Sequence, residues 1–169
     1  MNIKENSFSN LLLKDSFFLL IKPEENIYLN TCIRNSFFEE LGSLVKLGLK
    51  NIEIKWSNNK KWLDFVSEIK LNFPQINLGS ASIVNKQSIE DSLKIGLNFS
   101  MMKFWDKDLF NYSKSKNYLL IPGIKNLKDL EEAINLNFNI IKIYPIKSKA
   151  ISIDILNFES IDFIAAGGL

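Results

Sequence analysis

Two kinds of apolar pattern alternate along the chain. Short apolar or alternating runs predict strands, and longer segments with apolar residues every three or four positions predict helices. The short runs predict strands over residues 16–21, 51–56, 76–79, 97–102, 118–121, 139–145 and 161–166. The longer segments predict helices over residues 7–15, 31–47, 61–71, 88–95, 106–112 and 127–134, and a helical turn over 154–158.

Some expected elements carry more detailed predictions. The run over residues 16–21 has the composition of a strand buried on both faces. Asn30 or Thr31 is placed to cap the helix over 31–47, and Asn126 the helix over 127–134. In the helix over 31–47, one face is apolar and is expected to pack inward: Phe37, Phe38, Leu41, Leu44 and Val45.

The elements follow one another as strand, helix, strand, helix, with short loops and no linker. This order predicts one domain over residues 1–169, an α/β fold with a parallel sheet covered by helices. Segments 47–54, 95–102 and 136–143 resemble one another, and each marks the end of a helix turning into a strand. Such repeated units favour a TIM-type barrel. The alternative is an open doubly wound sheet, but its Gly-x-Gly-x-x-Gly turn is absent.

Glu53 and Lys142 occupy the same position in two copies of the repeat. Side chains alternate between the two faces of a strand, so both would point into the barrel if the neighbouring isoleucines meet the helices. A lysine there could be desolvated, neutral and nucleophilic, ready to form a Schiff base with a ketone. Two other readings stay open: a lysine that reaches water from an edge strand, and a buried ion pair that only holds the barrel interior.

Composition removes several classes of function. The chain has 24% charged residues, a net charge of +2 and no basic block, which argues against nucleic-acid binding. It has no histidine, which excludes serine–histidine and cysteine–histidine nucleophiles and histidine metal sites. Its one cysteine, Cys32, is compatible with the reducing cytoplasm. No signal-type or membrane-spanning apolar segment is evident, so we expect no membrane association. Schiff-base chemistry itself needs no metal or other cofactor.

Two further features could contact a substrate. Gly167 and Gly168 follow the last expected strand, where barrels bind phosphate or carboxylate groups through backbone N–H groups. An ordinary turn explains a glycine pair equally well. Ser82 could donate its hydroxyl to a carboxylate, although a helix cap or loop serine is the simpler interpretation.

Five motifs together resemble the KDPG/KHG aldolase family, the class I aldolases that cleave 2-dehydro-3-deoxy-phosphogluconate or 4-hydroxy-2-oxoglutarate to pyruvate and an aldehyde. The motifs are Ile-Glu-Ile at 52–54, Gly-Ser-Ala-Ser-Ile at 79–83, Ile-Pro-Gly-Ile at 121–124, Ile-Lys-Ile-Tyr-Pro at 141–145 and Ala-Ala-Gly-Gly at 165–168. The resemblance runs from about residue 16 to residue 169. It implies a barrel enzyme that acts on a small 2-oxo acid and assembles as a homotrimer.

The resemblance also implies roles for individual residues. Lys142 would be the Schiff-base lysine, and Glu53 the general acid and base. Substrate contacts would come from the residues at the matching motif positions: Ser82 at the carboxylate, Tyr144 lining the site, Gly167 and Gly168 at the phosphate, and Lys22 near a position where many members carry arginine.

The chain departs from the family pattern at several places. Ser57 stands where the family has an arginine that binds the pyruvate carboxylate, Met101-Met102 replaces Pro-Gly, and Ala166 replaces a threonine. Family members continue past the position of Leu169 through an eighth strand, so we expect a barrel that lacks its last βα unit and has unpaired strand edges. These departures keep an alternative open, a degenerate aldolase-like domain that binds an anionic metabolite or a protein partner. A third hypothesis is another lysine-dependent or phosphate-binding barrel enzyme.

Overall fold

The computed structural model describes residues 3–15, 17–146 and 161–167. Its strands are all parallel to their neighbours and lie side by side in chain order. The strands are β1 (Leu19–Ile21), β2 (Asn51–Lys55), β3 (Asn77–Ile83), β4 (Phe99–Met102), β5 (Leu120–Ile121), β6 (Gly123–Ile124), β7 (Ile140–Ile143) and β8 (Asp162–Ala165). The helices are α1 (Ile3–Lys14), α2 (Glu25–Leu29), α3 (Thr31–Lys46), α4 (Trp62–Asn72), α5 (Lys86–Ile95), α6 (Lys107–Ser115) and α7 (Leu127–Asn135).

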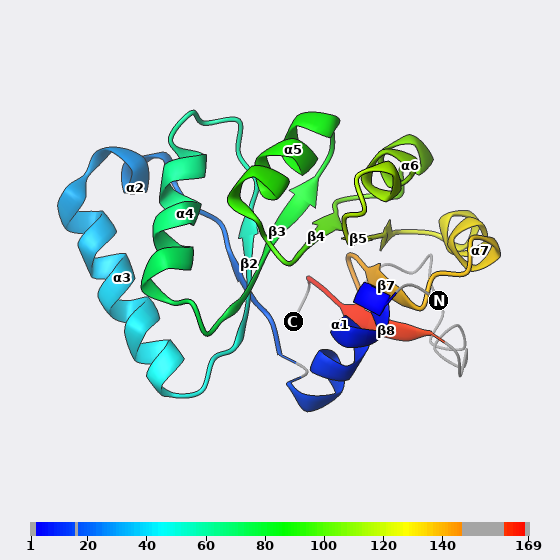
Figure 1. Ribbon diagram of the computed structural model, residues 1–169, viewed down its shortest axis with the longest axis horizontal. Coiled ribbons are helices and arrows are strands. Elements are labelled where there is room, and N and C mark those ends of the chain that lie inside the picture. Colours follow the sequence, from blue (N-terminus) through cyan, green and yellow to red (C-terminus); the bar gives the residue numbers. More distant parts are fainter. Residues whose placement is uncertain (1–2, 16, 147–160, 168–169) are drawn as a thin grey trace.

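Helices α3 to α7 form an arc around the outside of the strands, whereas α1 lies apart from that arc (Figure 1). The isoleucines of β2, Ile52 and Ile54, are fully buried in a cluster with α4 residues such as Phe65. Glu53 between them therefore points to the inner face, as the alternation predicts. The inner face carries its own cluster, in which Phe99 and Met101 of β4 pack with Phe8 of α1. Helix α1 thus covers the interior at the end opposite to the carboxyl ends of the strands.

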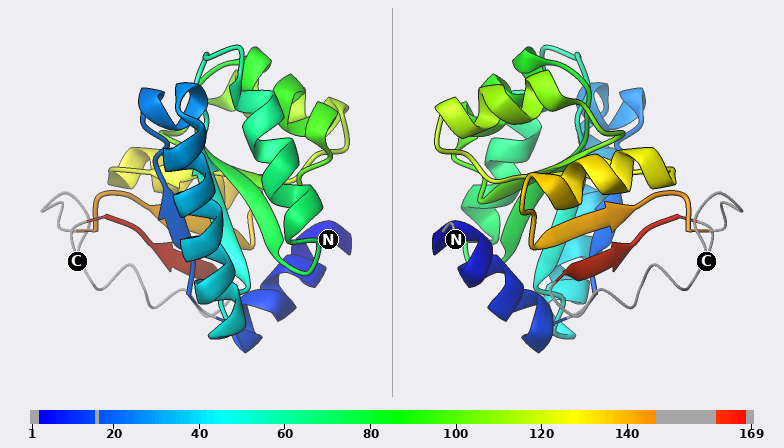
Figure 2. Two further views of the ribbon diagram at one scale, coloured as in Figure 1. Left: turned by 90° about the vertical axis from the view of Figure 1, so that its left-hand side faces the viewer. Right: turned by 90° about the vertical axis from the view of Figure 1, so that its right-hand side faces the viewer.

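Where the sequence predicts one strand over residues 118–121, the structure has two short strands, β5 and β6, with a proline between them. Pro122 stands between β5 and β6 and has no N–H to donate to a ladder. The ladder divides at this point into one sheet of β1 to β5 and one of β6 to β8. The Pro122 carbonyl still accepts a hydrogen bond from the Lys142 N–H at 2.9 Å, which keeps the two sheets in one continuous wall. Strands β7 and β8 complete it side by side (Figure 2).

The wall leaves two free edges among the described residues. There β1 pairs only with β2, and β8 only with β7. Leu20 of β1 is in register with Glu53 and lines the cavity, where it is 41% exposed, and Phe17, which also lines the cavity, is 65% exposed. The prediction that residues 16–21 form a strand buried on both faces is therefore wrong, because β1 has one neighbouring strand and its inner face borders the cavity.

The repeat has a conformational meaning. Its second residue is Gly48, Gly96 or Asn137, and each has a positive φ, of 105°, 71° and 58° respectively. Glycine and asparagine are the residues that adopt this left-handed conformation most readily, and it ends a helix by turning the chain out of its axis. The prediction that each copy ends a helix and starts a strand is confirmed.

Several element boundaries differ from those predicted. Asn30 caps α3 and Asn126 caps α7, as expected. Strand β3 is longer than predicted, α2 was not predicted, and Leu44 on α3 is 42% exposed instead of packed inward. Asn85 caps α5 through a capping box, so of the two simpler interpretations of Ser82, a helix cap or a loop serine, the helix cap is wrong. The expected turn at 154–158 lies outside the described residues.

Candidate active site

The side chains of Lys142 and Glu53 lie close together on the inner face of the curved sheet. Lys142 lies on β7 and Glu53 on β2, and the Lys142 Nζ is 3.8 Å from the Glu53 Oε2. Their side chains are only 8% and 7% exposed. The separation is too long for a direct hydrogen bond but short enough for both groups to contact the same small substrate. The interpretation of Lys142 as an edge lysine that reaches water is therefore wrong, because the chain folds around it.

Burial moves the pKa values of both groups toward their neutral forms. Desolvation raises the pKa of the Glu53 carboxyl above its ordinary value, and the nearby Lys142 charge opposes this only in part. Desolvation likewise lowers the pKa of the Lys142 amine, against the smaller opposing effect of Glu53. A neutral amine beside a protonated carboxyl is the pair that attack on a ketone requires, one group as nucleophile and the other as acid.

Glycines make room for this pair. Gly79 is the β3 partner of Glu53, and a Cβ there would come within 2.3 Å of the Phe99 ring, which fills the interior. Gly123 is the β6 partner of Lys142, and a Cβ there would come within 2.5 Å of the Met102 carbonyl oxygen. The glycines of the motifs at 79–83 and 121–124 thus allow the close backbone and side-chain packing that surrounds the two charged residues.

A cavity of about 1050 Å³ opens above the pair. The residues predicted to contact substrate line it where they are described: Lys22, Glu53, Ser82, Lys142, Tyr144 and Gly167. Gly168 lies outside the described residues. The structure thus brings together, from five separate strand ends, residues up to 145 positions apart in the sequence.

Two of these residues have special local structure. Ser82 has a φ of 61°, which is uncommon for serine, and it lies where the register between β3 and β4 shifts. Gly167 has a φ of 70°, and a Cβ there would come within 2.5 Å of the Tyr144 ring. For serine this conformation costs about 1–3 kcal/mol, and such strain concentrates at functional sites, whereas glycine adopts it without strain. Tyr144 and Gly167 are therefore packed as one unit at the cavity wall.

The structure adds lining residues that sequence reasoning missed, above all Lys55 and Lys103. Lys55 follows Glu53 by two positions, so strand alternation alone could have placed it on the same face. Lys103 comes directly after β4, where no periodic signal exists. Ser57, which stands at the family's arginine position, also lines the cavity. Within the described residues, no group of three or more carboxylate or cysteine side chains could hold a metal ion.

Sequence comparison decides the family. The model of the KDPG and KHG aldolase family matches residues 34–169, most of the chain. The chain belongs to this family. The protein of Pseudoalteromonas atlantica named 2-dehydro-3-deoxy-phosphogluconate aldolase is 23% identical over 131 residues. That match covers 75% of this chain and 60% of the relative, so the chain spans about three fifths of that relative's length.

Solved structures of KDPG aldolases share the fold of this family member. The Legionella pneumophila enzyme, captured with pyruvate as a covalent carbinolamine, superposes with a TM-score of 0.73 at 18% identity. The Zymomonas mobilis enzyme gives a TM-score of 0.72 at the same identity, and both matches cover 90% of this chain and 71% of the other. The predicted parallel α/β barrel fold is therefore confirmed. Among the described residues, no helix is long and apolar enough to cross a membrane.

Proposed function

We propose that the chain is a class I aldolase, which cleaves a 4-hydroxy-2-oxo acid to pyruvate and an aldehyde. The observation that carries the proposal is the buried pair of Lys142 and Glu53, 3.8 Å apart at the cavity. Substrates of this chemistry include 2-dehydro-3-deoxy-6-phosphogluconate and 4-hydroxy-2-oxoglutarate. Membership of the aldolase family supports the same reaction.

The pair suffices for each step of the reaction. The neutral Lys142 amine attacks the ketone carbon, Glu53 supplies the proton that turns the oxygen into a leaving water, and an iminium remains. The Glu53 carboxylate then takes the proton of the C4 hydroxyl while the C3–C4 bond breaks. The electron pair of that bond moves into the iminium, which becomes an enamine as the aldehyde leaves. Proton return to C3 and hydrolysis release pyruvate and the free amine.

Borohydride trapping tests this proposal. The protein is incubated with pyruvate and borohydride, and the modified residue is located by mass spectrometry of peptides. We expect an adduct on Lys142 in the wild type and none in Lys142→Met. Lys46→Met serves as the matched control, because Lys46 is an exposed lysine in the last turn of α3. An unmodified Lys142 would disprove the proposal.

A second candidate function has its own observation. Ser57 lines the cavity at the arginine position, and its hydroxyl accepts a hydrogen bond from the Asn59 N–H at 3.2 Å instead of presenting a positive charge. This favours a binding domain that holds an anionic metabolite without turnover. Such a domain predicts that Lys142→Ala changes ligand binding or stability while no aldol cleavage is measurable in either protein.

We also propose a homotrimer in the cytoplasm. Family resemblance supports the trimer, and the free thiol of Cys32 is compatible with a reducing compartment. Light scattering coupled to size exclusion measures the assembly directly, and we expect three times the mass of one chain. Cell fractionation with an antibody to the chain measures the location.

A further inference from the structure

Three lysines at the mouth of the cavity have no carboxylate partner. Lys22, Lys55 and Lys103 are exposed and line the cavity, and within the described part of the chain no ion pair involves any of them. Lys103 does contact an aromatic ring, with its Nζ 5.2 Å from the centre of the Phe104 ring. The ammonium groups are therefore available to an anion that enters from solvent.

Two of the lysines flank Ser82. Lys55 ends β2 and pairs with Ala81 of β3, the residue before Ser82. Lys103 follows β4, and its N–H donates to the carbonyl of Ile83, the residue after Ser82, at 3.1 Å. The two lysines thus stand on opposite sides of the irregular end of β3. Ser82 lies between these two contacts, at the shifted register and with a positive φ.

The charges around the cavity leave this end positive. The described lining contains two carboxylates, Glu53 and Asp162. Glu53 is buried against Lys142, and Asp162 begins β8, so it lies toward the amino end of the strands. Lys55 and Lys103 belong to the carboxyl end, and no carboxylate lining the cavity stands beside them there. An anion bound at this end gains attraction from both lysines.

We propose that Lys55 and Lys103, with the Ser82 hydroxyl between them, bind the carboxylate of the 2-oxo acid substrate. The inference rests on the proposed function, because it takes the ketone to lie at Lys142. The carboxylate of a 2-oxo acid is bonded to the ketone carbon, so its site must adjoin Lys142 and Glu53. Lys55 is two residues beyond Glu53 on the same strand face, roughly 7 Å along the strand, a distance that a lysine side chain spans. Ser57 cannot provide the positive charge, so lysines from the two strands on either side of β3 take that part.

The kinetic test varies the pyruvate concentration in the trapping reaction. Lys55→Gln and Lys103→Gln each remove one charge and keep the side-chain length, so each is expected to raise the half-saturating pyruvate concentration about fivefold, as for one partly exposed charge-assisted contact. The maximal trapping rate should not change, because Lys142 is untouched. Lys55→Arg should restore the wild-type value, and Lys46→Gln should match the wild type throughout.

An equilibrium test separates this inference from the aldolase proposal. Lactate carries the same carboxylate but has no ketone and cannot form a Schiff base, and lactamide is its neutral counterpart. Ligand-observed NMR on wild-type protein should show binding of lactate and not of lactamide, and Lys55→Gln and Lys103→Gln should weaken it. This result would support the carboxylate site even if trapping on Lys142 failed. Equal binding of lactate and lactamide, or unchanged binding and half-saturation in both glutamine variants, would overturn it.

Discussion

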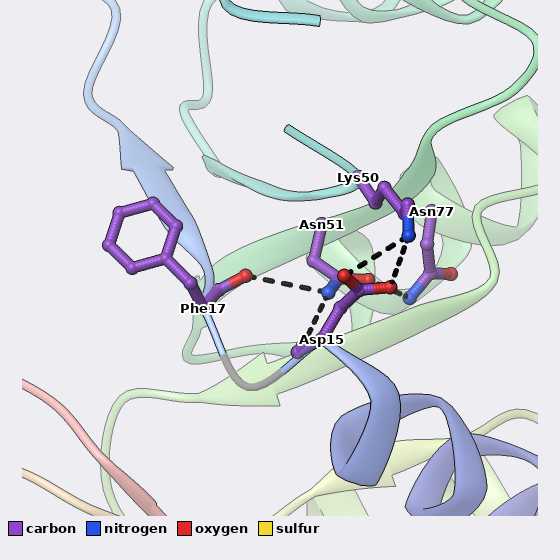
Figure 3. A network of polar contacts seen from close by, with 5 residues as sticks. All are labelled: Asp15, Phe17, Lys50, Asn51 and Asn77. Atoms are coloured by element: carbon purple, nitrogen blue, oxygen red, sulfur yellow. Dashed lines mark hydrogen bonds and ion pairs between the residues drawn. The ribbon is translucent and has the colours of Figure 1, made fainter. Parts of the chain in front are cut away.

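The polar side chains at the two ends of strands β2, β3 and β4 differ in whether they have partners. At the amino end, Asn77 donates to the Asn51 side chain at 3.2 Å, and Asn98 donates to Asn77 at 2.8 Å. Asn51 donates in turn to the Asp15 carbonyl at 2.8 Å (Figure 3). At the carboxyl end, Lys55 and Lys103 have no ion-pair partner among the described residues.

This difference indicates that the amino end stabilises the fold and that the carboxyl end carries the chemistry. Buried amides that satisfy one another hold the strands in register and tie the segment before β1 to the sheet. Buried or unpaired charges at the other end contribute little to folding or oppose it, as the pKa shifts of Glu53 and Lys142 indicate. Substitutions at the carboxyl end should therefore change activity, and substitutions at the amino end should change the free energy of unfolding.

The largest expected effect is that of Lys142→Met. Removal of the nucleophile should abolish both borohydride trapping and aldol cleavage, a loss of at least about 10³-fold in turnover, since Lys142 is the one amine among the described residues that forms an ion pair with Glu53. At a pH low enough to keep Glu53 protonated, the melting temperature should stay the same or rise, because methionine fills a similar volume and no buried charge is left unpaired. Turnover and thermal unfolding are measured on the same preparation. A large fall in melting temperature with turnover retained would contradict the comparison.

The next largest effect is that of Glu53→Gln. Loss of the proton donor and acceptor should lower the rate of cleavage by about 10²–10³-fold while the amide keeps the shape of the site. Steady-state kinetics with a 4-hydroxy-2-oxo acid measures this. The matched control is Asp64→Asn, which removes a carboxylate in the first turn of α4 and should leave the rate unchanged.

Glu53 also makes stability depend on pH. Its pKa is raised in the folded protein, so the folded state binds the proton more tightly than the unfolded one, and the resulting stability is lost as pH rises above the ordinary value of 4.5. The Glu53→Gln variant has no carboxyl group at this position, so it does not lose this stability as the pH rises. The variant should therefore gain stability relative to wild type as pH increases from about 4.5, in urea unfolding at a series of pH values. A constant difference between the two proteins would show that Glu53 is not desolvated.

At the amino end, Asn51→Ala should destabilise the protein by about 1–3 kcal/mol, because it leaves the Asn77 amide without an acceptor in a buried place. Trapping on Lys142 should be unchanged at temperatures where the variant is folded. Asn72→Ala is the control, since Asn72 is exposed and its side chain donates only to the Glu68 carbonyl of its own helix. Chemical denaturation measures both. If Asn51→Ala were as stable as wild type but reacted poorly in borohydride trapping, the assignment of stability to the amino end and of activity to the carboxyl end would be wrong.

The smallest effect is expected for Lys50→Ala at the same end. Lys50 pairs with Asp15 at 2.9 Å, but its side chain is 62% exposed, and exposed ion pairs contribute at most about 1 kcal/mol. Denaturation at low and high salt should give nearly equal free energies for the variant and a small salt-dependent loss for the wild type. The contrast with Asn51 would show that buried amides, and not surface charges, hold this end together.

Much of the fold could be predicted from local pattern. The alternation of strands and helices, the caps at Asn30 and Asn126 and the repeat whose second residue is Gly48, Gly96 or Asn137 are local features, each set by a few neighbouring residues. Errors arose where a long-range neighbour decided the outcome. Residues 16–21 have the composition of a buried strand, but β1 is an edge strand, and no local signal reports how many neighbours a strand has.

The residues of the site likewise divide into those that local pattern could predict and those that depend on long-range neighbours. Glu53 and Lys142 could be paired from the sequence because they occupy one position in a repeat, and a repeat converts sequence spacing into equivalent places around a barrel. Lys55 and Lys103 could not be joined in this way. Lys103 is positioned at the cavity by the hydrogen bond from its N–H to the carbonyl of Ile83 on the neighbouring strand. Ser82 is positioned there by the register shift between β3 and β4.

The sequence by itself determined the order of the elements, the family and the identity of the lysine and glutamate at equivalent strand positions. Only the tertiary structure decided that these two side chains are desolvated together, and that the lysines beyond them flank Ser82 without an ion-pair partner among the described residues. The physical reason is that burial and Coulomb interactions depend on distances between residues far apart in the chain, which no local pattern encodes.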